Sequence, residues 1–431
     1  MDLDLSQIKK VFVVGIGGIG VSAIARMLFL EGKEVSGSDM STSVVIQELE
    51  VLGIEVTIGQ GFELIPLDAD LIIYTIAIPH YDHQLFEQIK SSQIISRSYP
   101  EMLHLVTNNK YTIAIAGTHG KTTTTAMIGK VLVDTGKDPS IIVGSMLKEY
   151  KSNLVVGKSE YFVVEACEYE RSFLNIDPTI LVITNIEADH LDYYKDLADV
   201  ESAFVSLINQ TKSHVVCNPK DLPEGFNAPD EIEMVDYTKY LNQVPKLSVP
   251  GEFNRMNAAC ALAVVDILKI EKDRAANSLA SFSGTWRRLE KKGVTSKGVI
   301  IYDDYAHHPT EVRASLKALR ELYGDNKIVV VFQPHLYSRT KALFTDFVKS
   351  FSDADQIILL PIYFAREDPD PEVSSEKLSE AVKIIGKDCI ASTFSEAEAF
   401  LQGLPLQKGD VVVTMGAGEA YKVAEKVFQV V

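Results

Sequence analysis

A lysine, three threonines and two glycines follow a short apolar run near residue 116. Residues 117–123 read GTHGKTT and stand between a predicted strand and a predicted helix. Backbone amides of such a loop, together with the helix N-terminus, attract phosphate groups. Lys121 is placed to reach the β and γ phosphates of a nucleotide, and the hydroxyl of Thr122 to bind Mg²⁺. The pattern predicts a nucleotide-binding loop, although Ile115 stands where the full phosphate-loop motif has glycine.

A second glycine loop lies near the start of the chain. Gly15, Gly17 and Gly20 fit the GxGxxG pattern after a predicted strand, and Asp39 follows 19 residues after Gly20. An acid at that distance is typical of a dinucleotide-binding Rossmann unit, where it binds a ribose. The alternative is a tightly packed strand–helix turn without a ligand. The chain therefore offers two candidate nucleotide sites.

Carboxylates follow two further predicted strands. Glu165 begins the segment EACE, and residues 185–192 read NIEADHLD. Carboxylates at strand ends, downstream of a phosphate loop, suit Mg²⁺, which prefers oxygen ligands and shared phosphates. The alternative for both segments is a solvated acidic loop. We expect Cys167 to be a small packing residue and not a reactive thiol.

Histidines and an arginine follow two strands in the last third of the chain. Residues 303–311 read DDYAHHPTE, and residues 332–339 read FQPHLYSR. Open α/β sheets bind ligands at the carboxyl ends of their strands. Arg339 suits a carboxylate or a phosphate, and His307 and His308 are candidates for proton transfer unless they are surface residues.

Several other polar or aromatic residues carry less information. Arg287 and Arg288 stand at a predicted domain boundary, where they either contact nucleotide or solvate a linker. Trp286, His80 and His83 have no assignable chemistry, so we expect structural roles for them.

These residues are positioned by alternating strands and helices, which is typical of the α/β class. Strands are predicted at 11–14, 70–75, 112–116, 161–164, 180–184, 299–302, 327–332, 356–360 and 410–414. Helices are predicted after each glycine loop, over 254–269 and over 311–322. The pattern indicates domains at 1–106, 107–285 and 286–431.

Composition excludes several classes of protein. The 431 residues carry 42 basic and 59 acidic side chains, a net charge of −17, which disfavours nucleic acid and anionic membranes as partners. The start MDLDLSQIKK lacks the apolar segment of a signal peptide, and no apolar run is long enough to span a membrane. The four cysteines are widely spaced, as expected for reduced thiols in a cytoplasmic protein.

The ordered set of motifs resembles the Mur ligase family, the ATP-dependent amino-acid-adding enzymes of bacterial peptidoglycan synthesis. The resemblance covers essentially the whole chain. It rests on these segments in order: GIGGIGVS, SGSD, GTHGKTTTT, EACEYERSFL, TNIEADHLDYY, GEFNRMNAA, RRLE, DDYAHHPTE, FQPHLYSRT, YFAREDPDPEVSS and TMGAG.

The resemblance implies three α/β domains and a ligase activity. The N-terminal Rossmann-like domain would hold the UDP of the substrate, the central P-loop ATPase-like domain would bind ATP and Mg²⁺, and the C-terminal Rossmann-like domain would bind the amino acid. The implied reaction joins L-alanine to UDP-N-acetylmuramate through an acyl phosphate. The implied setting is cytoplasmic cell-wall precursor synthesis, and hence cell shape and division, by a monomer or weak homodimer.

The resemblance also assigns residues to roles. Lys121, His307, His335 and Arg339 would serve catalysis, and Thr122, Glu165 and His190 would bind the metal. The ATP site would include Asn257, Arg288 and Asp304 as well as the loop residues Gly117, Thr118, His119, Gly120, Lys121, Thr122 and Thr123. The UDP site would be lined by Gly17, Gly18, Ser38 and Asp39.

Three positions depart from the family pattern. Phe253 replaces a frequent histidine, Leu336 a common arginine, and Gln60 the histidine of a GH pair, so nucleotide contacts and amino-acid choice are expected to be affected there. Residues 201–207 contain no lysine, so no carbamylated lysine is expected.

Three other functions compete with this interpretation. A recycling ligase that attaches a preformed murein peptide would share most motifs but usually departs from GIGGIGVS. A nicotinamide-dependent oxidoreductase would explain GxGxxG and Asp39 but not residues 117–123. A non-catalytic nucleotide-binding regulator would not need Lys121, Glu165 and His190 together.

Overall fold

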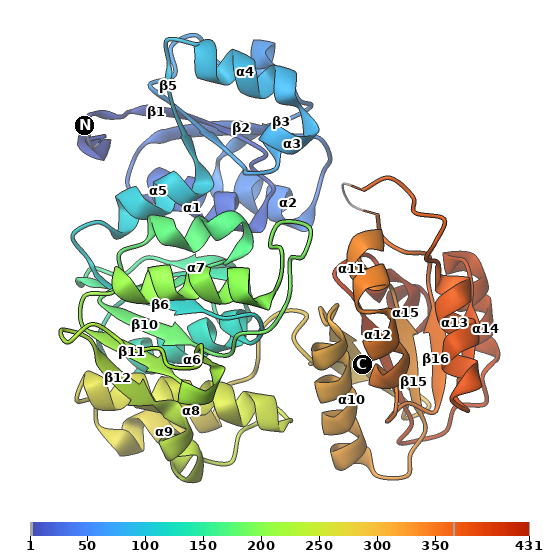
Figure 1. Ribbon diagram of the computed structural model, residues 1–431. Coiled ribbons are helices and arrows are strands. Elements are labelled where there is room, and N and C mark those ends of the chain that lie inside the picture. Colours follow the sequence, from blue (N-terminus) through green and yellow to red (C-terminus); the bar gives the residue numbers. More distant parts are fainter. Residues whose placement is uncertain (1–2, 365–366, 431) are drawn as a thin grey trace. The chain divides into compact units, whose positions relative to one another are not determined.

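The computed structural model describes residues 3–364 and 367–430. Within this part the chain forms two compact units. Unit 1 comprises residues 1–186, 201–240 and 260–278, and unit 2 comprises residues 187–200, 241–259 and 279–431. Three separate β-sheets with flanking helices confirm the predicted α/β class (Figure 1). The domain boundaries near 106 and 285 stay a prediction.

The first sheet of unit 1 is parallel and has the strand order β3-β2-β1-β4-β5. Helices α1, α2 and α5 lie on one face, and α4 covers the other (Figure 1). Strands β1 and β4 are almost wholly apolar because they are buried on both faces. The elements are β1 (Lys10–Val14), α1 (Ile19–Leu30), β2 (Glu34–Asp39), α2 (Val44–Leu52), β3 (Glu55–Ile58), β4 (Leu71–Tyr74), α3 (Ile78–Tyr81), α4 (His83–Ser91), β5 (Ile95–Ser98) and α5 (Tyr99–Thr107).

The second sheet has the order β12-β11-β10-β6-β9-β7-β8, with only the β7–β8 pair antiparallel among the described strands. Strand β6 lies between β10 and β9, so the carboxyl ends of these three strands meet at one edge. The elements are β6 (Tyr111–Ala116), α6 (Lys121–Asp134), β7 (Ser140–Leu147), β8 (Ser152–Val155), β9 (Tyr161–Glu165), β10 (Ile180–Ile183), α7 (Leu197–Asn209), β11 (His214–Cys217), β12 (Glu233–Asp236), α8 (Glu252–Ile267) and α9 (Lys272–Ala280).

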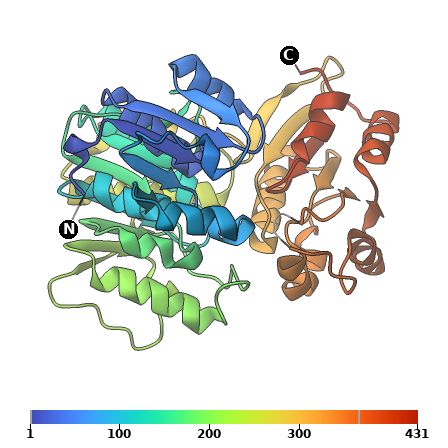
Figure 2. The ribbon, with the colours of Figure 1, turned by 90° about the horizontal axis from the view of Figure 1, so that it is seen from above.

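The sheet of unit 2 has the order β13-β14-β18-β15-β16-β17. One apolar cluster packs α10, α12 and α13 against one face, and a second packs α14 and α15 against the other (Figure 2). The elements are β13 (Glu290–Val294), β14 (Ile300–Asp304), α10 (Pro309–Tyr323), β15 (Ile328–Phe332), α11 (Tyr337–Ala342), α12 (Phe344–Ser350), β16 (Gln356–Leu359), α13 (Ser375–Ile384), β17 (Asp388–Ala391), α14 (Phe394–Gly403), β18 (Val411–Met415) and α15 (Tyr421–Val427).

The predicted helix boundaries shift by two residues for local reasons. Helix α10 begins at Pro309 instead of residue 311, because His308 caps it and Glu311 completes a capping box. Helix α8 ends at Ile267 instead of residue 269, where Lys269 turns into the left-handed region with φ 53°. Among residues 3–364 and 367–430, no helix combines the length and apolarity needed to cross a bilayer.

Candidate active site

The loop after β6 is held in shape by its neighbour strand. Gly117 and Gly120 both have positive φ, 129° and 83°, which glycine adopts at little cost. The Oδ1 atom of Asn185 accepts a hydrogen bond from the His119 amide (2.9 Å), and its Nδ2 donates to the His119 carbonyl (3.0 Å). The carbonyl of Asn185 also accepts from the Thr118 amide (3.0 Å). These three hydrogen bonds hold the loop against the segment that follows β10.

Lys121 places a partly buried cation across this loop. Its Nζ donates to the Gly117 carbonyl (2.6 Å) and the Thr118 carbonyl (3.1 Å), and it forms an ion pair with Glu168 at 2.9 Å. Burial opposes the charge on Lys121, but the Glu168 carboxylate outweighs it and holds the pKa of Lys121 above its usual range. The lysine thus stays protonated and can interact with phosphate oxygens.

Two side chains with oxygen atoms that could bind a metal, Thr122 and Glu165, lie next to the start of α6. The Thr122 hydroxyl donates to Oε1 of Glu165 at 3.1 Å, and Oε2 of Glu165 accepts from the Gly144 amide at 2.7 Å. Strand pairing sets this arrangement, because Glu165 at the end of β9 lies in register with Ile115 of β6. A hydroxyl and a carboxylate at the phosphate loop fit the oxygen preference of Mg²⁺. His190, the third predicted metal ligand, belongs to unit 2.

The loop after β1 has a different polar anchor. The Asp39 carboxylate at the end of β2 accepts a hydrogen bond from the Gly17 amide at 2.9 Å. Gly18 is the N-cap of α1 and makes no side-chain capping bond, so the first amides of that helix are not capped by a side chain. Gln60, the departure from the family pattern, donates from Nε2 to Asp82 at 2.9 Å.

In unit 2, an arginine and two histidines gather at the ends of β14 and β15. Arg339 binds Asp189 through two nitrogens, at 3.0 and 2.9 Å, and its Nη1 lies 3.1 Å from Nδ1 of His335. The ring centroids of His335 and His307 are 5.9 Å apart. Burial acts against the Asp189 carboxylate, but the Arg339 guanidinium holds its pKa well below the usual range. Asp189 is therefore ionised and holds Arg339 in place.

His307 and Asp304 have opposite shifts of pKa. Burial lowers the pKa of His307 to about 4, and burial raises the pKa of Asp304 to about 6. Each shift favours the neutral form of its group. Nδ1 of His307 lies 3.0 Å from the Tyr305 carbonyl, so it carries the proton of the neutral ring. Nε2 is then the nitrogen with the lone pair.

Arg287 was expected either to contact nucleotide or to solvate a linker, and the structure corrects this expectation. Its side chain is buried, binds Asp303 at 2.8 Å and donates to the carbonyls of Gly416 (2.7 Å) and Gly418 (3.1 Å). It is a structural cation that ties the segment before β13 to the TMGAG segment. Arg288, the neighbour with the predicted nucleotide role, lies over the Tyr305 ring at 5.1 Å.

One other expectation needs correction. Cys167 was expected to be a packing residue, but it is exposed, because it follows the end of β9. His80 agrees with the structural role expected for it, since its Nε2 lies 2.6 Å from a carboxylate oxygen of Glu170. His83 is exposed and lies 3.9 Å from Glu87, as a structural surface residue would.

The positions that depart from the family pattern have structural explanations. Leu336 has φ 68° and a buried side chain, and its amide donates to the Tyr363 carbonyl at 2.9 Å. Phe253 packs against the core of unit 2. Of the YFAREDPDPEVSS segment, Ala365 and Arg366 lie outside the described residues.

Each unit brings a different subset of the predicted residues together. Unit 1 gathers Gly117, Lys121, Thr122 and Glu165 around one loop. Unit 2 gathers His307, His335 and Arg339, and it also contains Asn257, Arg288 and Asp304. The motifs did not predict that Glu168 would bind Lys121 or that Asn185 would bind the backbone of His119, because these partners are distant in sequence. The only indication in the sequence was that both residues follow the end of a predicted strand.

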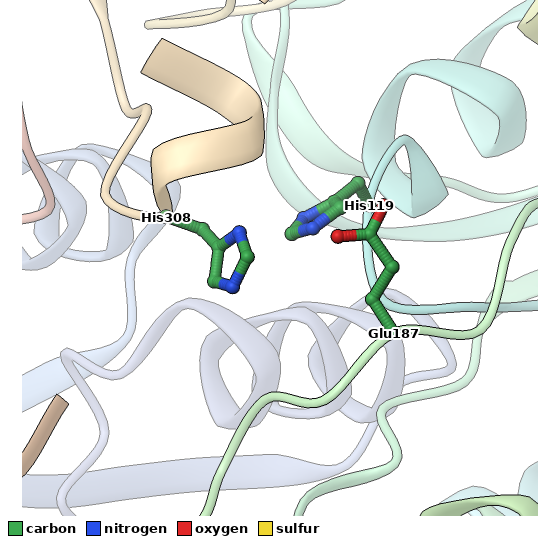
Figure 3. A group of neighbouring side chains, drawn as sticks. All are labelled: His119, Glu187 and His308. Atoms are coloured by element: carbon green, nitrogen blue, oxygen red, sulfur yellow. The ribbon is translucent and has the colours of Figure 1, made fainter. Parts of the chain in front are cut away.

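Residues of the types that bind metals also occur in addition to the predicted metal ligands. Figure 3 labels Glu187 and His308 of unit 2, together with His119 of unit 1. A ligand atom of Glu187 lies within 4.8 Å of one of His308, and the Glu187 carboxylate accepts from the Thr310 hydroxyl at 2.8 Å. The capping of α10 by His308 accounts for its place in the fold.

Comparisons with known proteins match nearly the whole length of the chain. The family models described as "Mur ligase family, catalytic domain", "Mur ligase middle domain" and "Mur ligase, glutamate ligase domain" match residues 10–111, 115–229 and 287–418. The chain is 38% identical to a UDP-N-acetylmuramate–L-alanine ligase of Clostridium acetobutylicum, with 98% of each chain covered. It is 39% identical to the protein of that name from Clostridium kluyveri, with 99% of each covered.

Solved structures agree in fold. A UDP-N-acetylmuramate–alanine ligase from Thermotoga maritima matches with a TM-score of 0.80 and 25% identity, covering 97% of this chain and 98% of that one. A murein peptide ligase from Psychrobacter arcticus matches with a TM-score of 0.68 and 18% identity, over 97% and 98% of the two chains. With both glycine loops, the strand-end carboxylates and the histidine–arginine cluster in place, the chain belongs to the Mur ligase family.

Proposed function

We propose that this chain is an ATP-dependent ligase that joins L-alanine to UDP-N-acetylmuramate and releases ADP and phosphate. The observation that carries the proposal is the pairing in unit 1 of a phosphate loop, whose Lys121 is held by Glu168, with a second glycine loop that lacks a lysine. One loop has the charge to bind a triphosphate, and the other has only amides and Asp39 for a UDP group. Relatives that carry this activity in their names match nearly the full length.

In the proposed reaction the carboxylate of the UDP-linked acid attacks the γ-phosphorus of ATP. The products of that step are an acyl phosphate and ADP. The amine of L-alanine then attacks the acyl carbon, and phosphate leaves from the tetrahedral intermediate. Lys121 and the amides at the start of α6 stabilise negative charge on the transferred phosphoryl group. The fixed loop and the ion pair with Glu168 supply this stabilisation without rearrangement at the moment of reaction.

We assign the metal to Mg²⁺, held by Thr122, Glu165 and His190. The hydroxyl and carboxylate of the first two residues are only 3.1 Å apart at the phosphate loop, which suits a hard cation that also binds phosphate oxygens. When bound, Mg²⁺ would neutralise charge on those oxygens. Asn257, Arg288 and Asp304 would complete the nucleotide site.

The two histidines of unit 2 have different proposed roles. Nε2 of neutral His307 has the lone pair that can accept the proton lost by the amine. His335 receives a hydrogen bond from Arg339 on Nδ1, so its neutral ring carries the proton on Nε2 and acts as a donor. His335 and Arg339 would therefore bind the amino-acid carboxylate, and His307 would act as the base.

A phosphate-release assay tests the function directly. Purified protein with ATP, Mg²⁺ and UDP-N-acetylmuramate should release phosphate when L-alanine is added, less with glycine or L-serine, and none without an amine. Rapid release with a murein tripeptide would instead indicate the recycling ligase. If no amine supports release, the proposal is wrong.

The setting of the enzyme follows from the reaction. ATP and a UDP-linked sugar acid are soluble metabolites of the cytoplasm, so we propose that the enzyme works there in cell-wall precursor synthesis. We propose a monomer or a weak homodimer, which sedimentation at several protein concentrations would test.

A further inference from the structure

Tyr99 stands at the same sheet edge as the first glycine loop. It directly follows β5, which pairs in parallel with β4 through Ser98 and Tyr74. It is also the first residue of α5, whose start is fixed by a capping box between Ser98 and Glu101 and by Pro100 in the first turn. Because the carboxyl ends of parallel strands share one edge, the position of Tyr99 is set by the sheet and by the helix cap together.

The ring of Tyr99 explains the last glycine of GxGxxG. A Cβ atom on Gly20 would lie 2.6 Å from Cζ of Tyr99 and 2.9 Å from its hydroxyl oxygen. Real Cβ atoms do not approach other atoms so closely, so residue 20 has no room for a side chain while Tyr99 occupies this place. The phenol therefore packs directly on the first turn of α1, the turn that no side chain caps.

Tyr99 also lies within electrostatic reach of the end of β9. Burial raises the pKa of its phenol, and Glu165 and Cys167 raise it further. A phenol is in any case protonated at neutral pH, so the hydroxyl is available as a hydrogen-bond donor. The side chain is only partly buried. It therefore combines contact with the proposed UDP loop with proximity to the carboxylate at the proposed ATP site, the two places that a UDP-linked acid must join to reach the γ-phosphate.

We infer that the Tyr99 hydroxyl binds the UDP-linked acid by donating a hydrogen bond to one of its anionic oxygens, in the diphosphate or in the carboxylate. This inference rests on the proposed function, because it places that substrate at the first loop. A donor at this point would align the acid with the second loop, and a phenylalanine could not replace it.

The test compares Tyr99→Phe with Tyr161→Phe, a matched change at the amino end of β9. Tyr99→Phe keeps the ring against Gly20 and removes only the donor. A hydrogen bond to a charged group is worth about 1.5–3 kcal/mol, so KM for UDP-N-acetylmuramate should rise about tenfold or more. KM for ATP and the melting temperature should not change. Tyr161→Phe should behave as the wild type.

Calorimetry with UDP and with UDP-N-acetylmuramate separates the two oxygens. Weaker binding of both ligands to Tyr99→Phe would place the bond on the diphosphate, and weaker binding of the full substrate alone would place it on the acid. Unchanged KM, kcat and affinity for both ligands would overturn the inference while wild-type turnover continued. Absence of amine-dependent turnover in the wild type would instead reject the proposed function.

Discussion

Both units hold a largely enclosed cation next to a loop, Lys121 partly buried in unit 1 and Arg339 buried in unit 2, but they hold it differently. In unit 1, Lys121 shares its protons between two loop carbonyls and Glu168. In unit 2, two nitrogens of Arg339 bind the same oxygen of Asp189, Oδ1, and its third nitrogen donates to His335. Lysine is a compact charge on a flexible stem, whereas arginine is a rigid planar fork.

The difference matches what each region is proposed to bind. A phosphoryl group carries negative charge on several oxygens, so a compact point charge with three donors is suitable. An amino acid must be oriented for attack, so a planar guanidinium is suitable. Lys121 of unit 1 keeps its charge, while unit 2 contains His307 and Asp304, whose pKa values are shifted to about 4 and about 6. Proton transfer therefore belongs to unit 2 in our proposal.

The largest effect is expected from removing the cation of unit 1. Lys121→Met should lower kcat for phosphate release by about 10³-fold, since one preorganised donor contributes about 10²–10³ to such reactions and a charged one contributes more. Lys130→Met on the same helix, where Lys130 pairs with Asp134 and Glu149, should change kcat less than threefold.

A double variant separates stability from chemistry in unit 1. Lys121→Met leaves Glu168 buried without its cation, so Glu168→Gln should restore part of the lost stability. It should not restore activity. Recovery of turnover in the double variant would show that Lys121 serves folding and not phosphoryl transfer.

Removing the cation of unit 2 should act first on stability. Arg339→Met leaves the buried Asp189 uncompensated, which costs about 3–5 kcal/mol. The free energy of unfolding from urea titration measures this, and Asp189→Asn in the same chain should recover a large part. A loss below about 1 kcal/mol would mean that this ion pair is no more stabilising than a surface pair.

Because His307 is neutral in the native state, we expect the free energy of unfolding to depend on pH. Its pKa of about 4 lies below the unfolded value near 6.5. Between these values the unfolded chain binds the proton and the native chain does not, so stability falls as the pH falls from 6.5 towards 4. The contribution is roughly 3 kcal/mol at most.

Urea titrations at pH 7, 5.5 and 4.5 measure this effect. His307→Gln should lose less stability than the wild type over that interval, and the exposed His83→Gln should follow the wild type. Parallel curves for wild type and His307→Gln would show that His307 protonates freely. In that case it would not be the neutral base that we propose.

The smallest effect is expected at the first glycine loop, residues 15–20, which has no charged side chain of its own. Asp39→Ala removes the acceptor of the Gly17 amide, so KM for UDP-N-acetylmuramate should rise about tenfold while KM for ATP is unchanged. Asp39→Asn keeps an acceptor oxygen and should have a smaller effect. Equal changes in both KM values would indicate that the two loops are not separate sites.

Much of the fold could be predicted because its signals are local. Strands β1, β6 and β15 are short apolar runs followed by glycine or polar residues, and their predicted bounds agree with the structure within one residue. The phosphate loop is a contiguous segment whose residue types and spacing state its chemistry. The end of α8 was misjudged because the left-handed turn at Lys269 has no sequence signal as strong as glycine.

The exposure of individual side chains could not be predicted in the same way, because it depends on residues that are distant in sequence. Cys167 was expected to be packed, since cysteine is usually buried, but strand β9 ends before it and leaves it exposed. Leu336 stands where arginine is common in the family, and the structure shows that its side chain is buried.

The sequence by itself determined the α/β class, the two glycine loops and the set of candidate catalytic residues, because each depends on a short segment. Only the tertiary structure decided which acid neutralises Lys121, which ring nitrogens of His307 and His335 are hydrogen-bonded and why residue 20 must be glycine. Glu168, Arg339 and Tyr99 lie 47, 150 and 79 positions from Lys121, Asp189 and Gly20. Strand order and register bring such residues together, and no local pattern records that pairing.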